Sequence, residues 1–191
     1  MKSKRKNYGL TLLELLLVFL VISLLLMGIF SLYEKIHVKD LSNQTVDEIN
    51  IIFNELILDT GDSNIFPPSF DTVNQGIGTI KNVIPDYISG NSIISPFGTS
   101  IDIGTDSSNT NLWITIHDIP ADACSSLVSN FSSKYKKIQV SNPEGVNGNG
   151  TIIQDTSNGI LYDPANAAAA CAAAEVNSKV GITNWISKTG S

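Results

Sequence analysis

The feature that most constrains this chain is a long, predominantly apolar run, residues 10–32, directly behind a basic N-terminal tip. As a helix, these 23 residues extend about 34 Å, enough to cross a hydrocarbon core of about 30 Å. Four basic side chains within residues 1–9 predict a cytoplasmic N-terminus. A cleaved secretory signal would have a shorter core and a small-x-small site after it, and residues 27–30 offer no such site. Length and flanks therefore favour a membrane anchor.

Charge is distributed unevenly along the 191 residues. Beyond residue 9 there are eight basic against eighteen acidic side chains, a formal balance of −10. Such a surface repels phosphate, so no direct nucleic-acid binding is expected. Abundant Gly, Ser, Thr and Asn with few aromatic residues fit an extracellular, turn-rich domain better than a cytosolic enzyme.

One ionisable residue, Glu14, interrupts the apolar run. A carboxylate in a membrane helix costs about 2–3 kcal/mol on insertion scales and is by default a functional hypothesis. The alternative is that Glu14 merely reaches the headgroups and favours the positive end of the helix.

The residues around Glu14 resemble the class III signal of type IV prepilins. That signal is a short basic leader ending in glycine, then a hydrophobic residue, Thr-Leu-x-Glu and a long apolar helix. Here the leader is 1–9, and Leu10-Thr11-Leu12-Leu13-Glu14 follows it.

The resemblance implies that prepilin peptidase cuts between Gly9 and Leu10 and that Leu10 becomes N-methylated. It also implies that the helix holds the subunit in the inner membrane before the pilus assembly machinery polymerises it with copies of itself. Glu14 would then pair with the terminal amine of a neighbouring subunit, because a carboxylate in a dry helix bundle needs a cationic partner.

The helix is expected to continue to residue 59, a total of about 75 Å, because 33–59 contains neither proline nor glycine. Gly61 is placed to end it. An apolar stripe at helical spacing predicts a face packed on a globular domain, 60–191. Polar residues fill much of the opposite side: Asp47, Glu48, Asn50, Asn54 and Glu55. The stripe is Val46, Ile49, Ile52, Phe53 and Leu56.

Residues 60–191 predict an α+β domain, a mainly antiparallel sheet with interspersed helices. Helices are expected at 71–84, 121–136 and 165–176, the last with Pro164 in its first turn. Alternation over 112–117 predicts the strongest strand, with Leu112, Ile114 and Ile116 on one face. Further strands are expected at 100–103, 137–141, 151–154, 160–163 and 180–187.

Cys124 and Cys171 are the only cysteines. An exported domain favours a disulfide between them over free thiols, and closing this loop would stabilise by about 4 kcal/mol in the chain-entropy model. Type IV pilins often carry such a bridge around a C-terminal region, here 124–171. Residues 84–88, 95–98 and 119–124 resemble segments of type IVb pilins, especially those of conjugative thin pili and related adhesive pili.

Other candidate sites are weaker. His37 and His117 are expected to be solvated or hydrogen-bonded residues, not metal ligands, and no cofactor is predicted. Asp59, Asp62 and Asn64 lack the glycine and terminal glutamate of a calcium loop. No phosphate loop, paired-carboxylate signature or nucleophile motif is present, so an enzyme is not expected.

The sequence therefore predicts a structural subunit, stored in the inner membrane and then displayed on the cell surface, with adhesion, conjugation and motility left open. A minor pilin, or a pseudopilin of a secretion system, would carry the same processing signal. A third reading is a membrane-anchored periplasmic enzyme or binding protein whose N-terminus matches the signal by chance.

Overall fold

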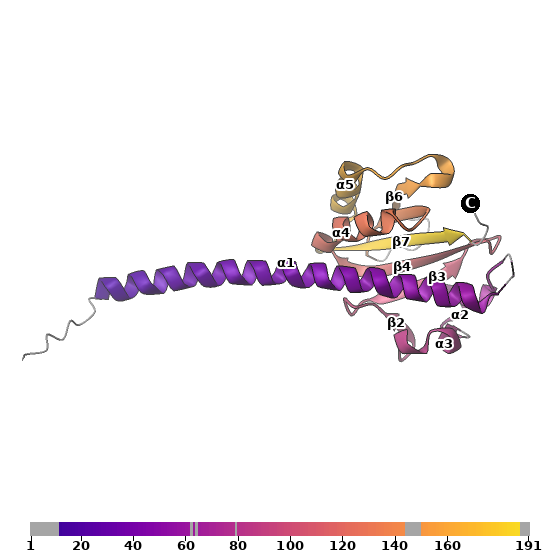
Figure 1. Cartoon of the computed structure of the whole chain (residues 1–191), viewed down its shortest axis with the longest axis horizontal. Coiled ribbons are helices and arrows are strands. Elements are labelled where there is room, and N and C mark those ends of the chain that lie inside the picture. Colours follow the sequence, from indigo (N-terminus) through magenta and orange to yellow (C-terminus); the bar gives the residue numbers. More distant parts are fainter. Residues whose placement is uncertain (1–11, 62, 64, 79, 144–149, 188–191) are drawn as a thin grey trace, which may run out of the picture. The chain divides into compact units, whose positions relative to one another are not determined.

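The computed structural model describes residues 12–61, 63, 65–78, 80–143 and 150–187 (Figure 1). Its first element is one long helix, α1 (Leu12–Asp59). Contacts within the chain divide it into two units, Met1–His37 and Val38–Ser191, and α1 runs through both. We call them the N-terminal unit and the head unit. The predicted leader and the predicted cut between Gly9 and Leu10 lie outside the described residues.

The C-terminal half of α1 belongs to the core of the head unit. All five residues of the predicted apolar stripe are buried, which confirms that face of the helix. Two buried hydroxyls on the same half are satisfied within the helix: Ser42 donates to the carbonyl of Val38 and Thr45 to that of Leu41, each at 2.8 Å. The helix ends as predicted, with Gly61 in the left-handed region at φ 53°.

Seven strands of the described residues form one antiparallel sheet, in the order β1-β2-β3-β4-β7-β5-β6. Their bounds are β1 (Ile88–Ser89), β2 (Ser92–Ile94), β3 (Ser100–Thr105), β4 (Asn111–Pro120), β5 (Lys137–Ser141), β6 (Gly150–Asp155) and β7 (Lys179–Ser187). The expected α+β fold, a long helix with a mainly antiparallel sheet, is confirmed. The last strand, β7, pairs with both β4 and β5.

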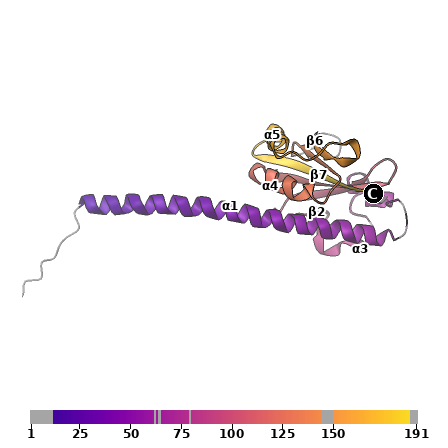
Figure 2. The same cartoon turned by 45° about the horizontal axis from the view of Figure 1, so that its top comes forward.

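Within the head unit, α1 and α4 (Ala121–Ser132) lie side by side on one face of the sheet (Figures 1 and 2). The apolar residues of α4, Cys124, Leu127, Val128 and Phe131, are fully buried there. A further helix, α5 (Pro164–Ala174), contacts α4 and the strands β5, β6 and β7. It therefore covers the part of the sheet that ends in the edge strand β6.

The opposite face of the sheet is also largely buried, which the expected alternation along β4 did not anticipate. The indole of Trp113 lies flat across Gly104 of the neighbouring strand, and a Cβ atom at Gly104 would overlap that ring. Its Nε1 donates to the carbonyl of Thr105 at 3.3 Å. Beside it, the hydroxyls of Thr115 and Thr183 form a fully buried hydrogen bond of 2.8 Å. These contacts of Trp113 and Thr115 with the neighbouring strands contribute to the burial of the second face of β4.

Several predicted elements were wrong in extent or kind. The expected helix 71–84 is two four-residue helices, α2 (Thr72–Gln75) and α3 (Ile80–Val83), because Gly76 and Gly78 adopt positive φ between them. Residues 160–163 are not a strand; Ile160 alone forms a bridge, with Asp155. The helix expected to reach residue 136 ends at Ser132, and the short strands β1 and β2 were not predicted. Short 3-10 turns lie at η1 (Pro68–Phe70), η2 (Pro85–Tyr87) and η3 (Thr156–Asn158).

Candidate functional site in the N-terminal helix and the disulfide-bounded region

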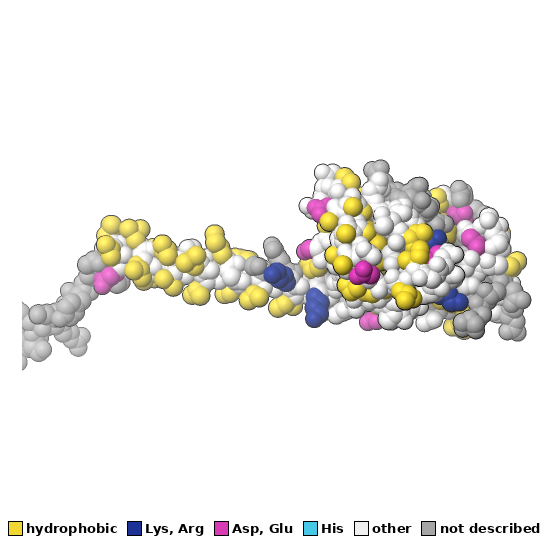
Figure 3. Space-filling view, turned by 90° about the horizontal axis from the view of Figure 1, so that it is seen from above, with side chains coloured by type: hydrophobic (Ala, Val, Ile, Leu, Met, Phe, Trp, Pro, Cys, Tyr) yellow, Lys and Arg dark blue, Asp and Glu magenta, His cyan; other side chains and the backbone are white. Residues whose placement is uncertain are grey.

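The described part of the N-terminal unit, residues 12–37, is helical and presents its apolar side chains outward. Leu12 is 80% exposed and Phe30 is 65% exposed, and hydrophobic side chains cover the visible face of this segment (Figure 3). An 18-residue window of α1 has a mean hydropathy of 3.0, and none of it is buried within the chain. By length and composition, this segment is able to cross a membrane, or to pack against other apolar helices.

Glu14 lies in the first turn of α1, and its side chain is exposed. The next charged residue along the sequence is Glu34, nearly six helical turns later. The carboxylate is therefore the one charge in a long apolar stretch of sequence. Any environment that removes this stretch from water must also accommodate the charge of the Glu14 carboxylate.

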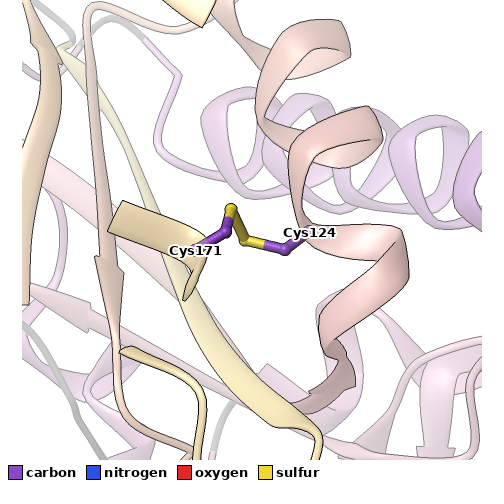
Figure 4. The surroundings of a disulfide bond; sticks show 2 residues. All are labelled: Cys124 and Cys171. Atoms are coloured by element: carbon purple, nitrogen blue, oxygen red, sulfur yellow. A yellow bond between two sulfur atoms is a disulfide. The ribbon is translucent and has the colours of Figure 1, made fainter. Parts of the chain in front are cut away.

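The two cysteines form a disulfide that joins α4 to α5 (Figure 4). Their Cα atoms are 6.0 Å apart, and both residues are almost completely buried. Cys124 comes from the first half of α4 and Cys171 from the second half of α5. The bridge closes the region 124–171, which contains β5, β6 and most of α5.

The sequence of α5 explains how it packs so closely on its neighbours. Asp163 caps its N-terminus by accepting a 2.9 Å hydrogen bond from the amide of Ala165, and Pro164 occupies the first turn. Ala167 and Ala170 are buried beside Cys171, and their small side chains let the helix approach the sheet. Its outer side carries alanines and no charged side chain.

His117 is hydrogen-bonded, as expected. Its Nε2 lies 2.8 Å from Oδ2 of Asp102, and its Nδ1 lies 2.9 Å from the carbonyl oxygen of Pro143. Burial opposes protonation of this ring, but the bonds to Asp102 and Pro143 and the charges of Asp102 and Asp118 outweigh it and raise the pKa of His117. The two hydrogen bonds of His117 connect the segment after β5 to strands β3 and β4.

Sequence reasoning missed the environment of Glu48. It was placed on the polar side of α1, but its side chain is half-buried, and its Oε1 atom has no hydrogen-bond partner among the described residues. Burial raises the pKa of the Glu48 carboxyl to about 7. Its position could have indicated this partial burial, because Glu48 lies one residue before Ile49 and four before Ile52, at the border of the buried stripe.

The remaining candidates show no organised chemistry. In the part of the chain that the structure describes, no three His, Cys, Asp or Glu residues lie close enough to hold a metal ion. His37 is exposed and stacks on Tyr33, with ring centroids 6.0 Å apart. Asp62 and Asn64, considered for calcium, lie outside the described residues.

Known proteins resemble this chain in its N-terminal segment and in its fold. Residues 4–30 match the family model of the prokaryotic N-terminal methylation motif. No curated protein sequence matches the chain. Among solved structures, the chain is similar to TcpA, a type IV pilin from Vibrio cholerae El Tor biotype, with a TM-score of 0.58 and 14% sequence identity. The alignment covers 78% of this chain and 99% of TcpA. The chain therefore carries the prokaryotic N-terminal methylation motif and has the type IV pilin fold.

Proposed function

We propose that this chain is the precursor of a filament subunit, cut between Gly9 and Leu10 by prepilin peptidase and methylated on Leu10. The observation that carries the proposal is the methylation motif at 4–30, which runs into a helix whose apolar side chains are exposed. The helix stores the subunit in the inner membrane with its N-terminus in the cytoplasm. Assembly machinery then transfers it into a surface pilus, where burial of apolar area between helices holds the copies together. The role is structural, without a cofactor.

Glu14 sets the register of each incoming subunit in this proposal. Cleavage creates an amine on Leu10, four residues before Glu14 and therefore about one helical turn away. In a dry bundle of helices, the amine of one copy compensates the carboxylate of its neighbour, and a register that separates them leaves both charges buried and unpaired. Processing and assembly thus depend on the same turn of helix.

Mass spectrometry of the full chain, coexpressed with prepilin peptidase, tests the processing step. We expect a mature protein that starts at methylated Leu10, and Gly9→Val should leave the chain uncut. An unprocessed wild-type chain that still begins at Met1 would instead support a membrane-anchored periplasmic protein.

Glu14→Leu tests assembly separately from processing. We expect this variant to be cut, methylated and retained in the membrane but absent from sheared filaments. Ser23→Leu is the matched control, because it also replaces a polar residue of the apolar segment but leaves the carboxylate in place. Normal filament yield from Glu14→Leu would remove the proposed role of that residue.

The finer assignments are also proposals. The type IVb-like subclass is supported by the segments 84–88, 95–98 and 119–124. Dominance of the chain in sheared filaments would support a major subunit over a minor pilin or pseudopilin. The disulfide-bounded region 124–171 is proposed as part of the filament surface that determines adhesion or cell contact.

A further inference from the structure

A groove runs between the start of α4 and the outer side of α5, next to the Cys124–Cys171 disulfide. Small side chains and two carboxylates provide most of its lining: Ala121, Asp122, Ser125, Ala168, Ala172 and Glu175. The small residues leave space for a long side chain from outside, and the carboxylates give the groove a negative charge. We call it the α4–α5 groove.

The position of Glu175 does not contribute to the stability of the head unit. It follows the last residue of α5, at the helix end where the macrodipole is negative, and it is exposed. Within the described residues neither Glu175 nor Asp122 forms an ion pair. The nearby Lys179 lies 3.6 Å from Asp118, so its charge is already partly compensated. The two groove carboxylates therefore remain available to a cation.

Suitable cations lie near the opposite end of strand β7, in and beside the connection from α4 to β5. The connection from α4 to β5, residues 133–136, has the sequence Ser-Lys-Tyr-Lys, and Lys137 begins β5. Lys137 lies over the ring of Trp185, 4.4 Å from its centroid, but Lys134 and Lys136 form no side-chain hydrogen bond or ion pair with the described residues. We call Lys134 and Lys136 the lysine pair.

The groove and the lysine pair are too far apart to meet within one copy. Lys137 pairs with Trp185 in the sheet, whereas the groove lies at the end where Pro120 pairs with Lys179. These positions on β7 are six residues apart, which is about 20 Å. Two copies displaced along the strand direction are able to bring opposite charges together.

We propose that the α4–α5 groove of one head unit receives the lysine pair of the next copy in the filament. The contact joins two different surfaces of the same molecule, and such head-to-tail contacts build a filament when the rotation between copies does not close into a ring. Charge complementarity selects the partner and its orientation, while the small side chains of the groove allow close approach. This inference rests on the proposed filament-forming function.

Charge reversal in the full chain, expressed with the assembly machinery, tests the contact. We expect Lys134→Glu/Lys136→Glu, and separately Asp122→Lys/Glu175→Lys, each to lower the recovery of sheared filaments about tenfold, since attraction becomes repulsion at a surface contact. The fourfold variant, with both reversals in one chain, should restore recovery. The exposed residues Lys81 on α3 and Asp86 in η2 are the controls, and Lys81→Glu or Asp86→Lys should leave recovery unchanged.

Coexpression of the two reversed chains gives the sharpest result. In a filament of either variant alone, like charges face each other across the contact. In a mixture, the lysines in the groove of one variant face the glutamates that replace the lysine pair in the other. We therefore expect mixed filaments that contain both variants. The membrane pool of each variant, with its disulfide formed, is measured to show that the head unit is folded, and Lys134→Gln/Lys136→Gln supplies a neutral version of the same test.

Wild-type recovery from both reversed variants, or failure of both the fourfold variant and the mixture to recover, would overturn the proposed contact. These outcomes are distinct from failure of the proposed function, in which the wild-type chain itself yields neither methylated Leu10 nor filaments.

Discussion

The hydroxyl of Tyr135 donates a 2.7 Å hydrogen bond to Oδ1 of Asn50. This bond connects the segment after α4 to the C-terminal half of α1. The Tyr135 ring also packs against Phe53 and Phe131, with centroid distances of 5.1 and 5.5 Å. Burial raises the pKa of the Tyr135 hydroxyl, so it stays protonated and able to donate. Docking of the helix in the head unit therefore combines aromatic packing with one directional polar contact.

Removal of the two partners of this bond should have unequal effects. Tyr135→Phe should lower the free energy of unfolding by about 1 kcal/mol, because half-buried Asn50 is able to bind water instead. Asn50→Ala should cost about 1–3 kcal/mol, since it leaves a buried hydroxyl without an acceptor. Urea unfolding of the full chain in detergent, followed by tryptophan fluorescence, measures both. A larger cost for Tyr135→Phe would contradict the assignment.

A second prediction concerns Asn184, which is fully buried in β7 beside Ile114 and Ile138. Neither polar atom of its side chain has a hydrogen-bond partner among the described residues. Asn184→Val should therefore raise the unfolding free energy by about 1–3 kcal/mol, because it removes an unpaired buried amide and adds a β-branched residue to a strand.

The preceding residue provides the control. Thr183 is equally buried but shares a hydrogen bond with Thr115, so Thr183→Val should destabilise the head unit. Opposite shifts in the thermal midpoints of these two variants would support an unpaired amide at Asn184. A lower midpoint for Asn184→Val would show that the amide has a partner, such as a buried water.

A third prediction is a pH dependence carried by Glu48. Its pKa is raised from 4.5 to about 7, so the folded state holds its proton more tightly than the unfolded state does. This contribution to stability is fully present below pH 4.5 and is lost as the pH rises through about 7. Glu48→Gln should therefore raise the thermal midpoint at pH 8 and change it little at pH 4. Parallel pH profiles for wild type and variant would contradict this account.

A fourth prediction concerns the Cys124–Cys171 disulfide, which closes a loop with a sequence separation of 47. In the chain-entropy model its loss costs about 4 kcal/mol. Cys124→Ala/Cys171→Ala should match the reduced wild type in urea unfolding, and both should unfold at lower urea than the oxidised protein. Reductant should have no further effect on the double variant.

Local patterns predicted the parts of the fold that depend on local physics. The stripe on α1, the buried face of α4 and the end at Gly61 follow from helical period and backbone conformation, and all three were found. Where local signals conflicted, the prediction failed. A strand was predicted at 160–163, but only Ile160 pairs, and the segment leads into the capped start of α5.

Long-range features were not readable from the sequence. The position of β7 between β4 and β5 depends on pairings across 59–76 residues for β4 and 40–48 for β5. The burial of Glu48 likewise depends on what packs against α1, and helical spacing alone placed it on the wrong side. For the candidate site, the motif around Glu14 could be recognised because it is a continuous stretch of sequence. The α4–α5 groove could not, because it forms only when the two helices pack in the folded head unit.

The central position of β7 also has a consequence for the order of events during biogenesis. Its residues 179–187 follow all the other strands of the sheet in the sequence, and until they are synthesised β4 and β5 each lack a neighbour in the middle of the sheet. The sheet of the head unit is therefore completed only after β7 has been synthesised. A chain truncated before residue 179 would keep α1 yet present unpaired edges of β4 and β5, which are open to pairing with other chains. The topology thus disfavours any shortened chain that lacks β7.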